Sequence, residues 1–491
     1  MSPVRPAAVI CLAAGEGTRM RSELPKVLHA IGGRTLLGHA VAVTRAIDPV
    51  HLVVVVRHGR DAVAEHVSAL DPTALLADQD EVAGTGRAVE CGLQALPPEL
   101  TGTVVVTMGD VPLLEAGTLQ ALVHAHQGSA VTLVTASLPD PRGYGRILRD
   151  PDGQVERVVE QRDADDEQAA INEINSGIYA FDVEVLRAAL EQVGTDNAQG
   201  EKYLTDVVAI ARRGGHRVGA HLVEDRWQTE GVNDRMQLAG LGGELNRRIL
   251  LHWMQAGVTV VDPATTWVDV DVRLGRDVTL LPGTQLHGDT VVESGARLGP
   301  DTTPTDVRVD AGASVVRTHG SGARIGAGAS VGPFAYLRPG TELHEAAKVG
   351  TFVETKNAEL GPGAKVPHLS YIGDASIGEG SNIGAGTITA NYDGATKSRT
   401  TVGRHCRTGS DNVFVAPVRL GDGAFTGAGT VVRTDVAPGA LAVSGGRQRQ
   451  VEDWVARKRP GSAADRAAGE AQMADGAQSG GTAAPNEEPH A

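Results

Sequence analysis

The feature that most constrains this chain is a run of branched apolar residues six positions apart in its C-terminal half. A helix repeats every 3.6 residues and a strand every 2, so neither keeps one residue type at every sixth position. A coil of short parallel strands does, because each hexapeptide points one apolar side chain inward. The spacing therefore predicts a parallel β-helix, with these inward residues: Leu274, Leu280, Leu286, Val292 and Leu298, then Ile325, Val331, Leu337, Leu343 and Val349.

An ordinary β-sandwich with Gly-rich turns is the alternative fold for this half. Sandwich turn signals recur about every 8–12 residues, with alternating polarity between them. The 62 glycines and 3 % aromatic residues of the chain favour the coil instead. Tight corners need Gly, and a narrow interior takes Val, Ile and Leu more readily than rings.

The six-residue rhythm has one interruption. After Val349 the apolar positions shift by five to reach Leu360, and they shift by five again at Ile377. Residues 391–395 (Asn-Tyr-Asp-Gly-Ala) have no place in the rhythm, and the rungs resume at Leu420. We therefore expect an inserted loop at residues 391–395.

The N-terminal half has a different pattern, in which apolar runs alternate with a segment of helical spacing. The runs cover residues 7–12, 51–56, 103–107 and 130–137, and the helical spacing covers residues 36–47. Strands that alternate with helices predict a mostly parallel, Rossmann-like α/β sheet. Ligands of such sheets bind beyond the carboxyl ends of the strands.

Polar motifs follow these expected strands. Gly15 and Gly17 lie in a turn after the first strand, and Arg19 and Lys26 follow as candidate partners for a phosphate. Asp110 comes directly after the third strand, where a carboxylate can ligate Mg²⁺. Gly84-Thr85-Gly86 opens an expected helix, whose free N–H groups would face a nucleotide.

Charge and cysteine content limit the class of protein. A formal net charge of −15 argues against a general binder of nucleic acid or anionic membranes, because phosphate groups attract basic surfaces. Cys11, Cys91 and Cys406 are far apart in the sequence, which predicts neither a disulfide framework nor a zinc site. No apolar run approaches the roughly 20 residues of a membrane span. We expect a cytoplasmic protein.

Four segments follow from these patterns. We expect a nucleotide-binding domain at residues 1–232, a helical linker at 233–257 and the coil domain at 258–460. At 1.5 Å per residue the linker helix would span roughly 35 Å. Residues 461–491 are mostly Ala, Gly, Ser, Gln, Pro and acidic residues, which predicts a disordered tail.

The motifs of both halves, in their order along residues 5–460, resemble one known family. It is the bifunctional bacterial N-acetylglucosamine-1-phosphate uridyltransferase/glucosamine-1-phosphate acetyltransferase family, whose first half is similar to sugar-nucleotide pyrophosphorylases. The resemblance implies a left-handed β-helix, a homotrimer with acetyl-transfer sites shared between subunits, and a supply of UDP-N-acetylglucosamine for peptidoglycan precursors of the cell wall. The matching motifs are residues 12–20, 24–29, 84–86, 109–113, 143–147 and 230–233 in the first half, and 336–340, 352–356, 368–374 and 382–387 in the coil.

For the first half, the resemblance implies transfer of a uridylyl group from UTP to N-acetylglucosamine 1-phosphate, with release of pyrophosphate. Arg19 and Lys26 would hold the phosphates, and Asp110 and Asn233 would ligate Mg²⁺. The protein supplies no nucleophile, because an oxygen of the sugar phosphate attacks the α-phosphorus. The remaining implied contacts are Leu12, Ala13, Ala14, Gly15, Gln79, Gly84 and Thr85 for the nucleotide, and Gly145, Glu160 and Asn175 for the amino sugar.

For the coil, the resemblance implies transfer of an acetyl group from acetyl-CoA to the amine of glucosamine 1-phosphate. An ammonium cannot attack a thioester, so a base with a pKa near neutrality is needed, and histidine is such a base. His368 stands at the position of the family's base. The other implied contacts are Arg338, Lys356, Tyr371, Asn382, Asn391 and Tyr392 for the sugar phosphate, and Ala385, Ser410 and Ala428 for acetyl-CoA.

The chain departs from the family's pattern at several of these positions. Glu16 stands where relatives often have Lys, Arg87 where many have His, and Met108 where some have Tyr. Gly445 falls where some relatives have an Arg that contacts CoA, and Arg447 and Arg449 are candidate replacements for it.

Two other functions remain open at this stage. One is a single-activity sugar-1-phosphate nucleotidyltransferase with a structural trimeric coil, which His368 and the loop at residues 391–392 disfavour. The other is a trimeric scaffold or nucleotide sensor. A protein that only binds a nucleotide needs no residues that also hold a metal and a second phosphate. The N-terminal motifs include such residues, so they disfavour the scaffold or sensor.

Overall fold

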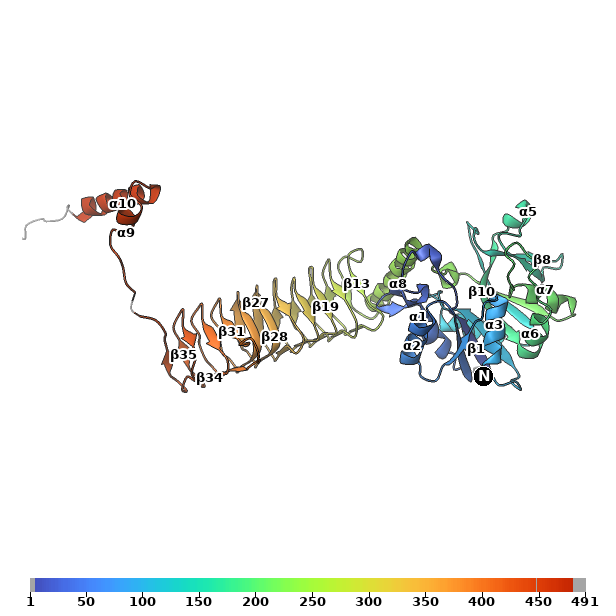
Figure 1. The fold of residues 1–491 in the computed structure, drawn as a ribbon, viewed down its shortest axis with the longest axis horizontal. Helices are drawn as coiled ribbons and strands as arrows, with labels where there is room; N and C mark the ends of the chain where they lie inside the picture. Colours follow the sequence, from blue (N-terminus) through green and yellow to red (C-terminus); the bar gives the residue numbers. More distant parts are fainter. Residues whose placement is uncertain (1–4, 447, 480–491) are drawn as a thin grey trace, which may run out of the picture.

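The computed structural model describes residues 5–446 and 448–479 of the chain. The molecule is elongated, with a sheet domain at one end and a long coil of short strands that leads away from it (Figure 1). A helix, α8, joins the two, and two more helices lie beyond the far end of the coil (Figure 1).

The sheet domain is built on a mixed sheet with the strand order β11-β7-β10-β6-β1-β4-β5. We expected a mostly parallel sheet, but β10 runs antiparallel to both of its neighbours, β6 and β7. After β7 the chain forms the small β8–β9 ribbon and re-enters the sheet through β10 at the edge where β7 ended. Strand β10 therefore runs in the opposite direction to β7. The strands are β1 (Ala8–Leu12), β4 (His51–Val56), β5 (Leu75–Asp78), β6 (Thr103–Met108), β7 (Val131–Ser137), β8 (Gly145–Arg149), β9 (Val155–Val159), β10 (Glu173–Asp182) and β11 (Val218–Val223).

Helices cover both faces of this sheet, so its central strands are buried on both sides. In β1, Ile10 and Leu12 pack into one core and Val9 and Cys11 into the other, as the two-residue period of a strand requires. The helices are α1 (Leu36–Arg45), α2 (Arg60–Leu70), α3 (Thr85–Gln94), α4 (Ala116–Ala125), α5 (Asp166–Ala169), α6 (Val183–Leu190) and α7 (Asp206–Arg213). Short elements complete the domain: η1 (Thr18–Met20), η2 (Lys26–Leu28), η3 (Arg226–Thr229) and the hairpin β2 (Ala30–Ile31) with β3 (Arg34–Thr35).

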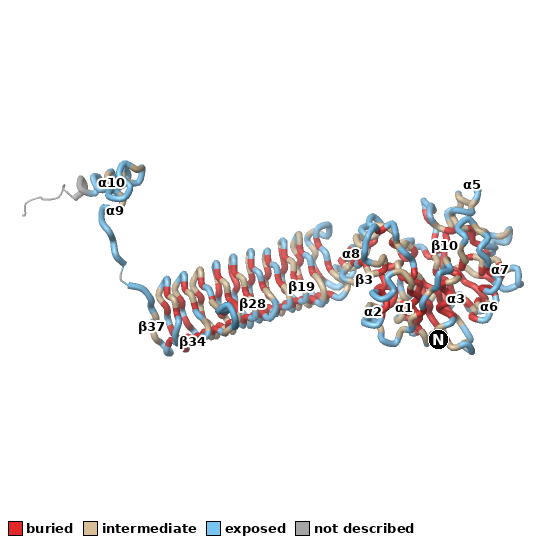
Figure 2. Tube along the Cα trace, viewed as in Figure 1, coloured by how far each residue is buried: buried red, intermediate tan, exposed pale blue. Residues whose placement is uncertain are grey.

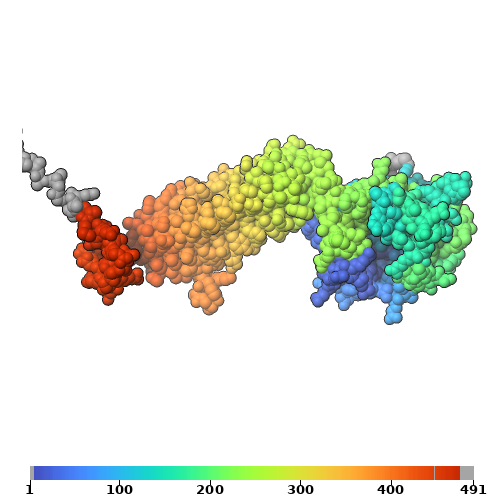
Figure 3. Space-filling view, turned by 90° about the horizontal axis from the view of Figure 1, so that it is seen from above, coloured from blue at the N-terminus to red at the C-terminus, as the bar shows by residue number. Residues whose placement is uncertain are grey.

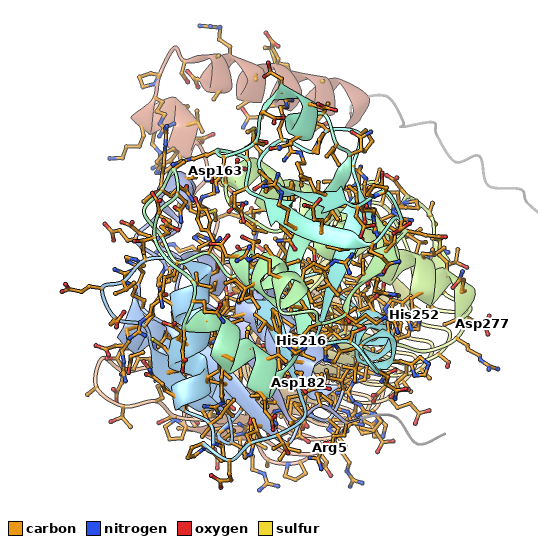
Figure 4. The ribbon with its side chains drawn as sticks, turned by 90° about the vertical axis from the view of Figure 1, so that its right-hand side faces the viewer. Arg5, Asp163, Asp182, His216, His252 and Asp277 are labelled. Carbon is orange, nitrogen blue, oxygen red and sulfur yellow. The ribbon has the colours of Figure 1, made fainter. Side chains whose placement is uncertain are left out.

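The expected linker helix is present as α8 (Arg235–Gln255). Asp234 caps its first turn by accepting a hydrogen bond from the Gln237 N–H at 2.9 Å. Seen from the sheet-domain end, His252 of α8 lies on the same side of the view as Asp277 of the coil (Figure 4). Buried Asn246 joins α8 to the first rung, because its side chain donates to the Thr266 carbonyl at 2.8 Å and accepts from the Val268 N–H at 3.0 Å.

The coil is a parallel β-helix, which confirms the fold expected from the six-residue spacing. Leu274 pairs in parallel with Val292, eighteen residues later, so three hexapeptides make one rung. All ten inward residues named from the sequence are buried, and Figure 2 shows buried positions recurring along the whole coil. After Val349 the next inward position is held by the fully buried Thr355, whose hydroxyl lies 3.0 Å from that of Thr341, and the five-residue step falls between Thr355 and Leu360.

The coil strands are short and number from β12 to β37. They are β12 (Thr259–Val260), β13 (Trp267–Val268), β14 (Arg273–Leu274), β15 (Thr279–Leu280), β16 (Gln285–Leu286), β17 (Val291–Val292), β18 (Arg297–Leu298), β19 (Thr303–Thr305), β20 (Arg308–Val309), β21 (Ser314–Val315), β22 (His319–Ser321), β23 (Arg324–Ile325), β24 (Ser330–Val331), β25 (Tyr336–Leu337), β26 (Glu342–Leu343), β27 (Lys348–Thr351), β28 (Glu354–Leu360), β29 (Lys365–His368), β30 (Tyr371–Ile377), β31 (Ile388–Ala390), β32 (Thr400–Val402), β33 (Val413–Val415), β34 (Val418–Leu420), β35 (Phe425–Thr426), β36 (Val431–Val432) and β37 (Leu441–Ala442).

The interruption of the rhythm is a loop between β31 and β32, closed by an antiparallel bridge between Tyr392 and Lys397. It projects from the side of the coil in the space-filling view (Figure 3). The loop therefore lies where the sequence placed it.

The C-terminal tail differs from the expected disorder. Residues 454–458 form α9 and residues 463–479 form α10 (Ala463–Ser479), while residues 480–491 lie outside the described part of the chain. Ala has the highest helix propensity, and Glu, Gln and Arg are close to it. A composition too polar to form a core can therefore still form a helix. The last coil strand, β37, ends at Ala442.

None of the helices within residues 5–446 and 448–479 combines the length and the hydropathy that crossing a membrane requires.

The rung interior makes a direct prediction about stability. Leu286→Ala removes a fully buried side chain from β16 and leaves a cavity between adjacent rungs. We expect the free energy of unfolding to fall by about 2–5 kcal/mol in urea titrations. Leu441→Ala is the control, because Leu441 is 67 % exposed in β37. Equal losses for the two variants would contradict the inward role of the six-residue positions.

Candidate active sites

The first candidate site is a cavity of about 430 Å³ at the carboxyl end of β1. Strand β1 pairs with β4 on one side and with β6 on the other. The order of the strands along the sheet therefore reverses at β1, and α/β sheets bind ligands beside such a reversal. The turn after β1 lines the cavity through residues 12–16, and the turn after β5 contributes Gln79. Seven predicted nucleotide contacts line this one cavity: Leu12, Ala13, Ala14, Gly15, Gln79, Gly84 and Thr85.

The loop before α3 forms one wall of this cavity. Gly84 has a φ of 116°, and a Cβ atom at this position would collide with the backbone of Lys202. Only Gly fits there. We expected free N–H groups at residues 84–86, but the Gly86 N–H donates to the Lys202 carbonyl at 2.8 Å, so this N–H cannot bind a phosphate.

Three predicted residues meet at the mouth of the cavity. The Lys26 Nζ atom forms an ion pair with Asp110 and lies 3.5 Å from the Asn233 Oδ1 atom. The Val232 N–H donates to the Asp110 carbonyl at 2.9 Å, which holds the two segments together. A carboxylate oxygen and an amide oxygen thus converge on one cationic atom. Mg²⁺ commonly uses one or two protein oxygens together with substrate phosphates, so this pair of donors fits Mg²⁺.

A second cavity of about 180 Å³ adjoins the first and shares Leu12, Thr85 and Met108 with it. Gly145, Glu160 and Asn175, the three predicted amino-sugar contacts, all line this second cavity. The Asn175 side chain is fixed in place, because its Nδ2 atom donates to the Tyr179 hydroxyl at 2.7 Å and its Oδ1 atom accepts from the Gly177 N–H at 3.3 Å. The two cavities together provide room for a nucleotide beside a smaller polar ligand.

Glu160 is the carboxylate of the second cavity. Burial raises its pKa above the ordinary value, and the charges of Asp163, Asp206 and Glu201 add to the effect. The Thr205 hydroxyl donates to Glu160 at 3.2 Å and partly opposes the rise. Glu160 therefore gains a proton at higher pH than an exposed glutamate does.

Arg19 is placed differently from the other predicted phosphate contacts. It lies on η1 with an exposed side chain and belongs to the lining of neither cavity. Glu16, one of the departures from the family pattern, lines the first cavity from an exposed position. Arg87 pairs with Asp80 at 2.6 Å and Glu90 at 2.8 Å, outside the cavity lining.

The second candidate site lies on the outer surface of the coil and begins at His368, the exposed last residue of β29. The three predicted acetyl-CoA contacts continue from it along successive rungs. The Gly386 N–H donates to the His368 carbonyl at 3.4 Å, the Asp411 N–H to Ala385 at 2.7 Å, and the Gly429 N–H to Ser410 at 2.8 Å. His368, Ala385, Ser410 and Ala428 therefore occupy equivalent positions in one column.

A cluster of positive charge lies on the neighbouring face of the coil. Arg338 and Lys356 occupy equivalent positions in successive rungs. Gly373 takes that position in the next rung, and the hydroxyl of Tyr371 lies where a Cβ atom of Gly373 would stand. Lys397, from the inserted loop, is close enough to Lys356 to lower the pKa of its ammonium group. Arg338 also pairs with Glu354 at 2.9 Å. The three cations outnumber the two nearby carboxylates, Glu354 and Asp374, so the cluster suits a phosphate group.

The inserted loop is fixed to the coil by Asp374. Asp374 accepts hydrogen bonds from Asn391 and, at 2.7 Å, from Asn357. Burial alone would raise the pKa of Asp374, but these bonds and the charges of Lys356 and Lys397 keep it below its ordinary value. Tyr392 is 59 % exposed at the tip, and Asn382 lies beside Lys365 and Arg407. Of the possible CoA contacts, Arg447 is outside the described residues.

A further group with metal-binding chemistry lies elsewhere on the coil. Glu342, His344 and Glu359 each direct a ligand atom to within 4.8 Å of the others, and all three are exposed. The His344 Nε2 atom lies 3.0 Å from Glu359. This contact continues the ladder of surface ion pairs that Arg308, Asp310 and Arg324 form on the preceding rungs.

A sheet domain with a nucleotide cavity, joined to a hexapeptide-repeat β-helix with a surface histidine, defines a sugar-nucleotide pyrophosphorylase fused to an acyltransferase. Comparison with known proteins agrees. The family model described as MobA-like NTP transferase domain matches residues 9–207. The chain is 59 % identical over 488 residues to a bifunctional protein GlmU of Kineococcus radiotolerans, covering 99 % of each chain. It is 61 % identical over 478 residues to the GlmU of Paenarthrobacter aurescens (96 % of each), and 62 % identical over 461 residues to that of Pseudarthrobacter chlorophenolicus (93 % of this chain, 94 % of the relative). The chain belongs to the bifunctional GlmU family.

Some residues that line these sites were not among those predicted from the sequence. Arg57 and His58 line the first cavity directly after β4, so the rule that singled out Asp110 would have found them too. Lys397, which the structure places beside Lys356, lies within the interruption of the six-residue period. The sequence signal for it was a basic residue in that inserted loop. Glu201 reaches the first cavity from a segment with no motif, and we see no sequence signal for it.

Proposed function

We propose that the two halves of this bifunctional enzyme of UDP-N-acetylglucosamine biosynthesis work in series. The coil transfers an acetyl group from acetyl-CoA to glucosamine 1-phosphate. The sheet domain then transfers a uridylyl group from UTP to the N-acetylglucosamine 1-phosphate that results. The observation that carries this proposal is that most of the predicted residues, Arg19 excepted, gather in two separate places, one at the sheet and one on the coil.

In the sheet domain the chemistry is a displacement at phosphorus. An oxygen of the sugar phosphate attacks the α-phosphorus of UTP, the bond to the β-phosphate bridging oxygen breaks, and pyrophosphate leaves. The adjoining cavities would hold the two reactants side by side, which is the main requirement of such a reaction. Lys26 would neutralise charge that develops on the phosphates.

Asp110 and Asn233 would hold Mg²⁺, the cofactor that we propose for this half. Their oxygens already converge on the Lys26 ammonium, so a cation is accommodated at that point. Bound Mg²⁺ supplies charge neutralisation at the phosphates of UTP. Lys26 would then release Asp110 and turn to the nucleotide phosphates.

On the coil the reaction is attack of an amine on a thioester. His368 would remove a proton from the amine of glucosamine 1-phosphate, the nitrogen would attack the acetyl carbon, and the C–S bond of acetyl-CoA would break. Arg338, Lys356 and Lys397 would hold the sugar phosphate. The column above His368 would align acetyl-CoA along the coil axis.

We also propose that the protein is a homotrimer in the cytoplasm and that its product feeds peptidoglycan synthesis. An apolar column lies one residue beyond the His368 column: Phe334, Phe352 and Leu369 are 52 %, 59 % and 63 % exposed, and the two rings stack at 5.4 Å. Exposed apolar patches of this kind are typical of interfaces. A second subunit on this corner would bury the column and enclose His368.

Two substitutions test whether the sites are independent. His368→Ala removes the base, so we expect acetyl transfer to fall by about 10²–10⁴-fold while uridylyl transfer is unchanged. Asp110→Asn removes the charged metal ligand and should have the reverse effect. Thiol release and pyrophosphate release, measured separately on each purified variant, give the two rates. Loss of both activities in either variant, with its oligomeric state intact, would disprove separate sites.

Glu160 predicts a pH dependence of sugar binding. Its raised pKa means that the ionised form, which accepts hydrogen bonds from sugar hydroxyls, is lost at a higher pH than in an ordinary glutamate. We therefore expect the KM for N-acetylglucosamine 1-phosphate to rise as the pH is lowered below neutrality.

Glu160→Gln supplies the baseline for this measurement, because the substrate phosphate itself titrates near pH 6. The variant should have a higher KM at neutral pH and a weaker dependence on pH than the unmodified enzyme. Parallel KM profiles for the two proteins would show that Glu160 does not control sugar binding.

A further inference from the structure

Arg248 of α8 makes the most extensive set of ion pairs between the helical arm and the sheet domain. Its Nη1 atom lies 3.0 Å from Glu115, its Nη2 atom 2.7 Å from Asp225, and its Nε atom 2.8 Å from Glu244 of the same helix. Each nitrogen binds a different carboxylate. The Arg248 side chain is 22 % exposed; its partner within the helix, Glu244, is 8 % exposed, whereas Asp225 is 37 % and Glu115 58 % exposed, so only the Glu244 pair is well shielded from solvent.

The first of these partners belongs to the segment that carries Asp110. Glu115 follows Asp110 by five residues, and the segment between them packs Val111 and Leu114 into the core. Gln228 reinforces the link, because its Oε1 atom accepts hydrogen bonds from the Glu115 N–H at 3.3 Å and from the Thr118 hydroxyl at 2.5 Å. Arg248 thus holds one end of the turn that presents Asp110.

The second partner belongs to the segment that carries Asn233. Asp225 precedes η3, which leads through residues 230–232 to Asn233. The Asp225 carboxylate also accepts from the Trp227 N–H at 3.3 Å and the Gln228 side chain at 3.4 Å, so it fixes the start of η3. Arg248 therefore bridges the two segments whose oxygens converge on Lys26.

We propose that Arg248 is a positioning residue for the metal site of the uridylyl-transfer half. It does not touch the site. It sets the separation of Asp110 and Asn233 by tying both of their segments to α8. A lysine has one charged atom and cannot reach three carboxylates in three directions, so the geometry of the guanidinium is required. This inference rests on the proposed function, in which Asp110 and Asn233 hold the metal.

The test measures metal binding directly. The full chain is saturated with UTP, and Mn²⁺ is titrated while free Mn²⁺ is followed by electron paramagnetic resonance. Loss of a group hydrogen-bonded to a metal ligand typically weakens metal binding by about 10–100-fold, and Arg248 acts one step further out, so we expect Arg248→Ala to raise the Mn²⁺ Kd by about tenfold, the lower end of that range. Arg248→Lys should recover only part of this loss. Acetyl transfer by the same protein should stay unchanged and reports that the chain is folded.

Arg247→Ala is the matched control. Arg247 neighbours Arg248, but its side chain is 62 % exposed and pairs only with Glu244 among the described residues. Its Mn²⁺ Kd should stay within about twofold of the unmodified value. If Arg248→Ala fails to fold, Asp225→Asn tests the same link and should also weaken Mn²⁺ binding, because it removes one of the three charges.

The outcomes separate this inference from the proposed function. Unmodified Mn²⁺ affinity in Arg248→Ala, or in Asp225→Asn, would overturn the role of Arg248. Full rescue by Arg248→Lys would also overturn it, since charge alone would then suffice. Asp110→Asn should abolish the UTP-dependent Mn²⁺ site. If it does not, the assignment of the metal ligands is wrong, whatever Arg248 does.

Discussion

The structure depends on the requirement that every rung of the coil fill the same narrow interior. Strands of two residues cannot bury a face alone, so each inward side chain is covered by the rungs above and below it. This explains why Leu and Val recur at every sixth position, and why the buried Thr355 at such a position has a partner for its hydroxyl, that of Thr341. The same stacking fixes the outward side chains. Residues that are one rung apart come to lie in straight columns along the coil.

These columns bring together the residues of the proposed acetyl-transfer site, which are far apart in the sequence. His368 and Ser410 are separated by forty-two positions, yet they occupy equivalent places two rungs apart. The cations are arranged in the same way, and the inserted loop adds Lys397 from the side. Because hydrogen bonds between rungs hold the backbone, the Cα positions of His368 and of the cations are fixed relative to one another. A rigid arrangement of this kind suits a reaction that requires alignment of two substrates.

The sheet domain reaches a comparable arrangement by different means. Its three key side chains come from loops, and these loops are held by contacts outside the cavity. Lys26 precedes the β2–β3 hairpin, which contacts the coil through the Gly32 carbonyl, a hydrogen-bond acceptor for the Val270 N–H at 2.9 Å. Arg248 holds the other two segments to the arm. The arm and the first rung are thus part of the support of the uridylyl site as well as a connection between domains.

Much of this could be predicted from the sequence, because it depends on local repetition. The six-residue period specified the coil and the residues inside it, and the apolar run at residues 51–56 is the strand β4 without change. The antiparallel course of β10 was missed because it depends on where the chain returns from the β8–β9 ribbon. The Arg248 pairs were missed because they join residues 23 and 133 positions apart. The tail was misjudged for another reason: polar composition excludes a core, but it does not exclude an Ala-rich helix.

The central claim is that one chain carries two active sites that act in series, and a single assay tests it. The purified protein receives glucosamine 1-phosphate, acetyl-CoA, UTP and Mg²⁺, and free thiol and pyrophosphate are followed separately. The account predicts thiol release first, followed by pyrophosphate after a lag. Pyrophosphate that forms only when N-acetylglucosamine 1-phosphate is supplied, with no thiol release, would mean that the coil is a scaffold and would contradict the account.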